Sequence, residues 1–311
     1  MSILRRVLVI PCYNEELTIA KVVTDFKKEL PADCRIVVMN NRSTDNSAEL
    51  ASAAGAEVFF VARQGKGAVV REIFRSIDAD VYIMVDGDDT YPAEDVHKLL
   101  APVEAGNSDM AVGDRISGGA YGQVNDRRFH GFGNILVKKL VNFCFKSDLR
   151  DIMTGYRVFS RSFVENVPIL SDGFEVETEM TIRALDRKLS IVEIPIAYRN
   201  RPEGSFSKLN TLRDGMRVLK TIFFILKDYR PLLFFGALSL LFLLAGCASG
   251  VPVLLEFMRT RFITRVPLAL LATGLVLVSA VTLNCALILD TFVAHERQRN
   301  ELERVCRKNK R

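Results

Sequence analysis

The first 113 residues alternate between short apolar runs and longer stretches in which apolar positions recur every three or four residues. The short runs are rich in β-branched residues and predict strands at residues 7–11, 36–39, 58–61, 81–85 and 110–113. The longer stretches predict intervening helices at residues 16–30, 48–54, 68–77 and 93–104. This alternation predicts an α/β, Rossmann-like fold with a mostly parallel, doubly wound sheet. Ligands of such sheets bind at the carboxyl ends of the strands, so the residues after each strand are the candidate site.

The hydrophobic pattern changes at Pro231. Residues 231–255 and 266–289 contain no charged side chain, and each run is long enough to cross about 30 Å of hydrocarbon as a helix. We therefore predict two transmembrane helices, at about 231–256 and 266–292; the alternative is a pair of buried helices in a soluble core.

A third pattern precedes these helices. Residues 211–230 place apolar side chains at helical spacing between basic ones, which predicts a helix that lies either in the membrane interface or against the first domain. The expected domains are a globular one at 1–210, an amphipathic interfacial segment at 211–230, two transmembrane helices within 231–293, and a basic tail at 294–311.

The net charge of +5 is unevenly distributed. Residues 1–230 carry 32 basic and 32 acidic side chains, whereas residues 295–311 carry 7 and 3. A basic stretch that follows an apolar run typically faces anionic lipid, so we expect a membrane partner and no nucleic acid. The basic residues that flank the two apolar runs outnumber the three arginines between them, which predicts that the first domain and both termini are cytoplasmic. The six cysteines form no CxxC pair, which fits a reducing compartment.

The fourth predicted strand leads directly into Asp86, Gly87 and Asp88. Two carboxylates at this spacing, held at a sheet edge, suit a divalent cation such as Mg²⁺ or Mn²⁺ that keeps waters and bridges two phosphates. Lys or Arg partners that neutralise the two carboxylates are the alternative. The apolar strand before them directs them into the expected ligand crevice, which favours the metal.

Polar residues follow the other strands as well. After the first come Pro11, Tyr13, Asn14 and Glu15, which offer a rigid turn, an aromatic face and acceptors for a nucleotide base. Asn14 and Glu15 suit a helix N-cap equally well. After the third strand, residues 63–67 offer cations and a flexible backbone for a phosphate, without the spacing of a P-loop.

Four segments, PCYNEE at 11–16, STD at 43–45, GKG at 65–67 and DGD at 86–88, resemble in order and spacing the family-2 inverting glycosyltransferases of the GT-A fold. Later segments are similar to the polyprenyl-phosphate branch, which includes dolichyl-phosphate mannose synthase and bacterial enzymes that load undecaprenyl phosphate with glucose. These are GDR at 113–115, TGYRVFS at 154–160, GFEVETE at 173–179 and RPEGSFSK at 201–208. The resemblance covers residues 5 to 210, and the two apolar runs agree with the bacterial members.

The resemblance implies three groups of site residues. It implies nucleotide-sugar contacts at Pro11, Tyr13, Asn14, Glu15, Asn40, Lys66 and Asp86. It implies metal ligands at Asp86 and Asp88. It implies that the acceptor phosphate is bound by Arg115, one or both of Arg127 and Arg128, Arg201, Ser207 and Lys208, with catalysis resting on Asp88, Arg115 and Lys208. In two departures, Asn40 replaces the usual base-binding Asp, and Thr90 replaces a Gln common in dolichyl-phosphate mannose synthases.

The implied reaction is transfer of a hexose, from UDP-glucose by analogy, to undecaprenyl phosphate with inversion, at the inner (plasma) membrane. The product would be a lipid-linked sugar donor for glycan or lipopolysaccharide modification. A phosphate monoester with a second pKa of about 6 is largely dianionic near neutral pH, so it attacks without a dedicated base. Alternatives are a polymer-forming synthase, whose usual QxxRW motif needs a Trp that this chain lacks, and a membrane-tethered pseudoenzyme, suggested by Asn40 and Thr90. A homo-oligomer is left open.

Overall fold

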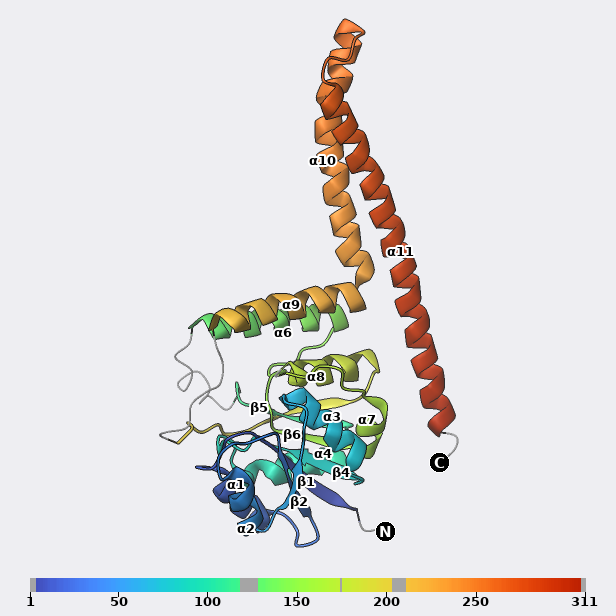
Figure 1. Ribbon diagram of the computed structural model, residues 1–311. Coiled ribbons are helices and arrows are strands. Elements are labelled where there is room, and N and C mark those ends of the chain that lie inside the picture. Colours follow the sequence, from blue (N-terminus) through green and yellow to red (C-terminus); the bar gives the residue numbers. More distant parts are fainter. Residues whose placement is uncertain (1–3, 118–127, 174, 203–210, 309–311) are drawn as a thin grey trace. The chain divides into compact units, whose positions relative to one another are not determined.

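A computed structural model of the chain (Figure 1) describes residues 4–117, 128–173, 175–202 and 211–308. Within these ranges it describes the side chains outside 128–132, 134, 211–219, 300 and 303–308. The chain divides into two compact units, Met1–Met216 and Arg217–Arg311.

A seven-stranded sheet forms the centre of the first unit, in the order β3-β2-β1-β4-β6-β5-β7. Its strands are β1 (Arg6–Cys12), β2 (Arg35–Asn40), β3 (Glu57–Phe60), β4 (Val81–Met84), β5 (Met110–Asp114), β6 (Arg157–Ser160) and β7 (Ile191–Pro195). Only β6 runs antiparallel to its neighbours. The mostly parallel sheet is therefore confirmed, and the other six strands end at one common edge. Arg157, the first residue of β6, pairs with Met84 and Val112 near this edge.

Helices cover both faces of this sheet. Alternate residues of β1 belong to separate apolar clusters: Leu8 packs with Phe26 of α1, and Val9 packs with Ile73 of α3. The first cluster is completed by α1 (Ile19–Glu29), α2 (Ser47–Ala53), a 3-10 turn (Ala93–Asp95) and α4 (Val96–Glu104), and the second by α3 (Lys66–Ser76), α7 (Arg161–Asn166) and α8 (Val176–Asp186). A further helix, α6, spans Arg128–Phe145. Burial on both faces explains why the strands read as continuous apolar runs.

The second unit contains a pair of antiparallel helices, α10 (Pro231–Thr260) and α11 (Val266–Lys308). α10 ends at Arg261, which adopts a left-handed conformation with φ +56°. Both helices are long and apolar enough to cross a membrane, over Pro231–Thr260 and Val266–Arg299. The basic tail expected as a separate segment from residue 294 instead continues α11 to Lys308. The helix expected at residues 211–230 is present as α9 (Thr211–Tyr229), and its membrane placement stays a prediction.

Small side chains form the contact between α10 and α11. The buried residues repeat every seven positions, with Ser239, Gly246 and Val253 on α10 facing Ala272, Ser279 and Ala286 on α11. Ser239 and Ser279 exchange hydrogen bonds, since each Oγ donates to the other's carbonyl oxygen at 2.9 Å. The large apolar side chains, such as those of Leu240 and Leu270, point outward. This pattern is typical of helices that pack in lipid.

Candidate active site

The turn after β1 is hydrogen-bonded to the turn after β2. The backbone N–H of Asn14 donates to Ser43 Oγ (3.1 Å), and the Asn14 side-chain oxygen accepts from the Thr44 N–H (2.8 Å). The N-cap of α1 is Thr18. Neither Asn14 nor Glu15 therefore caps this helix, and the capping alternative is wrong. Asn14 adopts a left-handed conformation, φ +54°, which Asn tolerates better than most residues.

Asn40 lies at the last position of β2, opposite Cys12 of β1. Its side-chain oxygen accepts a hydrogen bond from the Ser43 N–H at 2.9 Å. This oxygen was expected to accept from a nucleotide base, and here it shapes the turn that contacts Asn14. The base contact of Asn40 stays a prediction, as do those of Pro11, Tyr13 and Glu15.

Asp86 and Asp88 follow β4 at the common carboxyl edge, and each is paired with a cation. Asp86 forms an ion pair with Lys66. Asp88 Oδ2 lies 2.5 Å from Arg201 Nη2, and its Oδ1 accepts from Thr90 Oγ1 at 2.6 Å. The structure thus brings both carboxylates together with two of the predicted cations, which is the arrangement that the alternative to a metal describes, and metal binding by Asp86 and Asp88 stays a prediction. Burial and the nearby charge of Asp86 raise the pKa of Asp88 above its usual range, and Arg201 opposes this shift.

Lys66 lies between two carboxylates. Its Nζ contacts Asp86 and is 2.5 Å from Glu177 Oε1. Burial alone would lower the pKa of Lys66, but the two carboxylates outweigh burial and raise it, so Lys66 stays a cation. Glu177 is buried at the start of α8 and holds Lys66 in place.

The phosphate contact expected at residues 63–67 stays a prediction, and two backbone N–H groups of this turn already have partners within the chain. The Gly65 N–H donates to Asn41 Oδ1 (2.7 Å), and the Gly67 N–H donates to the Asp172 carbonyl (3.0 Å). A Cβ added at Gly65 would lie 2.0 Å from that same carbonyl oxygen. Glycine is therefore needed here because another backbone segment approaches closely, and Lys66 is the residue of this turn that reaches Asp86.

The carboxylates fit a divalent cation. A Cβ at Gly155 would lie 2.3 Å from Asp86 Oδ2, so this glycine admits the Asp86 carboxylate against the backbone that precedes β6. In the described part of the chain, no group of three His, Cys, Asp or Glu side chains could hold a metal. Mg²⁺ commonly takes one or two protein carboxylates and completes its shell with water and substrate phosphates. Asp86 and Asp88 match that donor set.

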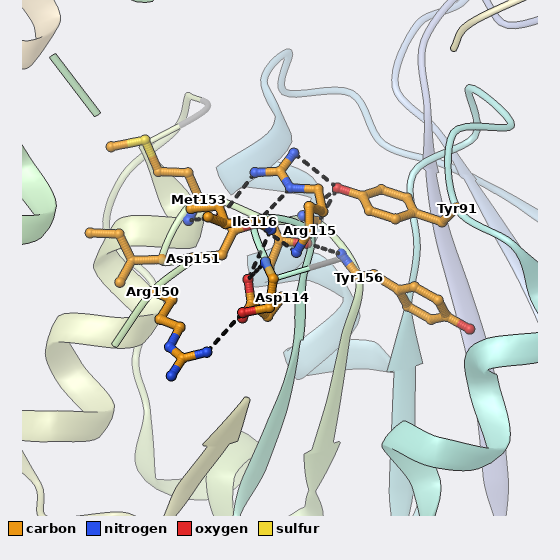
Figure 2. A network of polar contacts seen from close by, with 12 residues as sticks. Tyr91, Asp114, Arg115, Ile116, Arg150, Asp151, Met153 and Tyr156 are labelled. Carbon is orange, nitrogen blue, oxygen red and sulfur yellow. Dashed lines mark hydrogen bonds and ion pairs between the residues drawn. The ribbon is translucent and has the colours of Figure 1, made fainter. Parts of the chain in front are cut away.

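Arg115 and Arg201 are the predicted acceptor-phosphate cations that the structure places. Arg115 follows β5 and forms a two-pronged ion pair with Asp151, with distances of 2.7 and 3.0 Å (Figure 2). Arg201 pairs with Asp88. The remaining members, Arg127, Arg128, Ser207 and Lys208, lie outside the residues whose side chains the structure describes.

Sequence reasoning overlooked two neighbours of Arg115. Tyr91 is buried, and its hydroxyl accepts from the Gly155 N–H at 3.0 Å. Asp151 lies three residues before the TGYR segment that had been singled out. Their positions next to recognised segments were the available signal, but the contacts of Tyr91 and Asp151 with Arg115 and Gly155 join residues 24 to 64 positions apart in the chain.

Residues 7–167 match the family described as Glycosyl transferase family 2. Glycosyltransferase AglJ of Haloferax volcanii is 32% identical over 295 residues, which cover 94% of this chain and 95% of that protein. Dolichyl-phosphate hexose transferase of the same organism is 31% identical over 215 residues, or 69% of this chain and 91% of that protein.

A solved structure is similar as well. Glucosyl-3-phosphoglycerate synthase from Mycobacterium tuberculosis, in complex with Mn²⁺, uridine diphosphate and glucosyl-3-phosphoglycerate, aligns with a TM-score of 0.57 at 20% identity. The alignment covers 73% of this chain and 80% of that one. This likeness shows the fold of the first unit, which is GT-A.

Proposed function

Because the chain belongs to glycosyl transferase family 2 and to its polyprenyl-phosphate branch, we propose that it transfers one hexose from a nucleotide sugar to polyprenyl phosphate, with inversion. The observation that carries this proposal is the pairing of Asp86 and Asp88 with Lys66 and Arg201 at the carboxyl edge of the sheet. In this proposal the two carboxylates bind the metal and the two cations bind phosphates.

The donor half of the proposal rests on the turns after β1, β2 and β4. Asp86 and Asp88 would hold Mg²⁺ or Mn²⁺, which when bound would neutralise charge on the donor diphosphate and on the leaving group. Lys66 adds a buried, permanently charged ammonium beside Asp86. Pro11, Tyr13, Asn14, Glu15 and Asn40 line the adjoining turns and bind the nucleotide. UDP-glucose is the proposed donor, by analogy with bacterial members of the branch.

The acceptor half rests on Arg115 and Arg201, with Arg127, Arg128, Ser207 and Lys208 as further proposed contacts. These groups orient the acceptor phosphate and offset its repulsion of the donor diphosphate. A phosphate oxygen attacks the anomeric carbon as the bond from that carbon to the diphosphate breaks, so the configuration inverts. The attacking phosphate is already ionised, and no side chain has to remove a proton. Positioning and electrostatics therefore account for the catalysis.

Polyprenyl phosphate resides in a membrane, and several features support a membrane location. α10 and α11 are long and apolar enough to span a bilayer. On the first unit, α6 exposes the side chains of Ile135, Leu136 and Phe143 and also carries Lys138 and Lys139. Exposed apolar residues combined with lysines on one helix suit a lipid headgroup surface. We propose that the first unit and both termini are on the cytoplasmic side of the inner (plasma) membrane.

A donor panel tests this function. The full chain in detergent receives undecaprenyl phosphate and radiolabelled UDP- and GDP-sugars, with Mn²⁺ or with EDTA. We expect label in the lipid from one donor, abolished by EDTA and by Asp88→Ala but retained by Asp80→Asn. Asp80 is a matched control because its ion pair with Arg161 lies away from the carboxyl edge, beside Arg5 at the start of β1. Absence of label from every donor, with the protein folded, would reject the proposal and favour a polymer synthase or a pseudoenzyme.

A further inference from the structure

The Arg115 guanidinium is held along one edge by Asp151. Arg115 Nε donates to Asp151 Oδ2 at 2.7 Å, and Nη2 donates to Oδ1 at 3.0 Å. Both side chains are buried, and Asp151 is only 4% exposed. Paired hydrogen bonds between a planar guanidinium and a carboxylate fix orientation as well as distance. Asp151 therefore sets the orientation of the Arg115 guanidinium (Figure 2).

Asp151 is itself fixed by the backbone around it. Its carboxylate accepts from the N–H groups of Arg115 (3.2 Å) and Met153 (3.3 Å). Its own N–H donates to Glu193 Oε1 at 2.7 Å. Glu193 belongs to β7, which pairs with β5 immediately before Arg115. The support for Arg115 thus comes from backbone N–H groups and from the Glu193 side chain of the sheet.

Tyr91 connects this ion pair to the donor side. Its hydroxyl contacts Arg115 Nη1 at 3.4 Å and accepts from the Gly155 N–H at 3.0 Å. Gly155 packs against the Asp86 carboxylate, and the Arg115 guanidinium also lies 5.3 Å from the ring centre of Tyr198. Arg115 is thus held at a fixed place relative to the Asp86 turn.

Two roles of Asp151 are compatible with its short ion pair with Arg115. Asp151 either withholds Arg115 from an incoming phosphate or presents Arg115 to it. Displacing Asp151 would leave a buried carboxylate without its cation, which is strongly unfavourable. The Nη1 contact with Tyr91 is the longest that Arg115 makes to these partners, so it is the one most easily exchanged for a phosphate oxygen.

We propose that Asp151 is a positioning residue that fixes Arg115 for the acceptor phosphate, an inference that rests on the proposed transferase function. Asp151 touches neither donor nor acceptor in this account, and its effect on the reaction passes through Arg115. The consequence is selective: loss of Asp151 weakens use of the acceptor and leaves use of the donor unchanged.

The test compares full-length wild type with Asp151→Asn, Asp151→Glu and the control Asp80→Asn. A short-chain polyprenyl phosphate and the active nucleotide sugar are varied separately, and Mn²⁺-dependent UDP binding is measured by calorimetry. Loss of a residue that orients a metal ligand typically costs about 10- to 100-fold, and by analogy we expect the acceptor KM of Asp151→Asn to rise by a similar factor. The donor KM and UDP affinity should stay at wild-type values. Asp151→Glu should regain part of the acceptor affinity because it keeps the charge.

A lower acceptor KM in Asp151→Asn would overturn the inference and show that Asp151 withholds Arg115. Equal losses for donor and acceptor, accompanied by a lower Tm, would also overturn it by showing a purely structural role. If Asp151→Asn does not fold, the same comparison is made with Asp151→Glu, where an unchanged acceptor KM rejects the inference. A wild-type protein that binds UDP but labels no polyprenyl phosphate would reject the proposed function itself.

Discussion

The two units of this chain are packed in opposite ways. In the first, large side chains such as Phe26, Phe159 and Phe163 are fully buried between sheet and helices. In the second, the contact between α10 and α11 consists of small residues such as Gly246 and Ser279, while large apolar side chains face outward. Water drives large apolar groups together, whereas lipid gives no such advantage, so helices there associate through close approach and hydrogen bonds. The difference indicates that the units are built for different solvents.

Arg157 in the first unit and two serines in the second are buried polar residues that are paired, whereas the buried hydroxyls of Ser108 and Tyr156 have no hydrogen-bond partner among the described residues. Arg157 is fully buried, and its guanidinium donates to the carbonyls of Ile152 and Thr154 and to Thr181 Oγ1. The hairpin satisfies its two buried serines with each other. An unpaired buried donor or acceptor is costly in protein or lipid alike.

The largest expected change in stability comes from truncating a large buried side chain in the first unit. The comparison is the same truncation of a large exposed side chain in the second unit. Phe159 is fully buried and stacks on Phe163 with ring centres 4.7 Å apart, so Phe159→Ala should destabilise the first unit by about 3–5 kcal/mol. Leu270 on α11 is 69% exposed, and Leu270→Ala should leave that stability unchanged. Thermal unfolding in detergent, followed by near-UV circular dichroism, measures both. Equal destabilisation by the two variants would break the comparison.

A smaller effect is expected when a glycine of α10 that faces α11 is replaced by a larger residue. A Cβ at Gly246 would lie 2.9 Å from Val276 Cγ2 on α11, whereas Gly236 has nothing within 4 Å. Gly246→Leu should therefore weaken the hairpin by about 1–3 kcal/mol through overpacking. Gly236→Leu is the matched control and should be neutral. Unfolding of the hairpin in mixed micelles by increasing SDS gives the measurement, and a neutral Gly246→Leu would contradict the described contact.

The paired serines should contribute less. Ser239→Ala removes the hydrogen bond that Ser239 Oγ donates to the Ser279 carbonyl, and such bonds between membrane helices average about 0.6 kcal/mol. The double variant Ser239→Ala/Ser279→Ala should cost no more than the single variants combined, because the serines satisfy each other. The same SDS titration decides this, and a stabilised Ser239→Ala would show that the bonds do not hold the helices together.

The smallest effect concerns a surface ion pair. The hydrogen bond from the Arg5 N–H and the nearby Arg161 lower the pKa of Asp80 below its usual range, against the effect of burial. Its stabilising contribution is therefore complete above the unfolded pKa of about 3.9 and is lost as pH falls through the lower folded value. Asp80→Asn should cost about 1 kcal/mol or less near pH 7, since the pair is partly solvated. The Tm difference from wild type should vanish at the lowest pH; a constant difference would contradict this.

Local sequence pattern was sufficient for much of the first unit. The strands and helices of residues 7–104 are present with boundaries shifted by a few residues, because their periodicity and length are local properties. The antiparallel β6 and the edge strand β7 were not predicted. The place of β6 between β4 and β5 is decided by pairing with strands far away in the sequence.

The candidate site shows the same limit. Asp86 and Asp88 were found because the strand before them identifies the sheet edge. The close approach of the Asp172 backbone to Gly65 was not predicted because Asp172 lies more than a hundred residues further along the chain. Asp151 was overlooked because only the fold brings it to Arg115. The residues proposed to bind a ligand carried a local signal, whereas the residues that position them did not.

The most direct test of the central claim counts the sugars on the lipid. The full chain, reconstituted in vesicles that contain undecaprenyl phosphate, is incubated with the active nucleotide sugar and Mn²⁺, and the lipid is analysed by mass spectrometry. The account predicts undecaprenyl phosphate that has gained a single hexose, with none gained in Asp88→Ala. A lipid that carries a ladder of hexoses, or an unmodified lipid beside released nucleoside diphosphate, would contradict it.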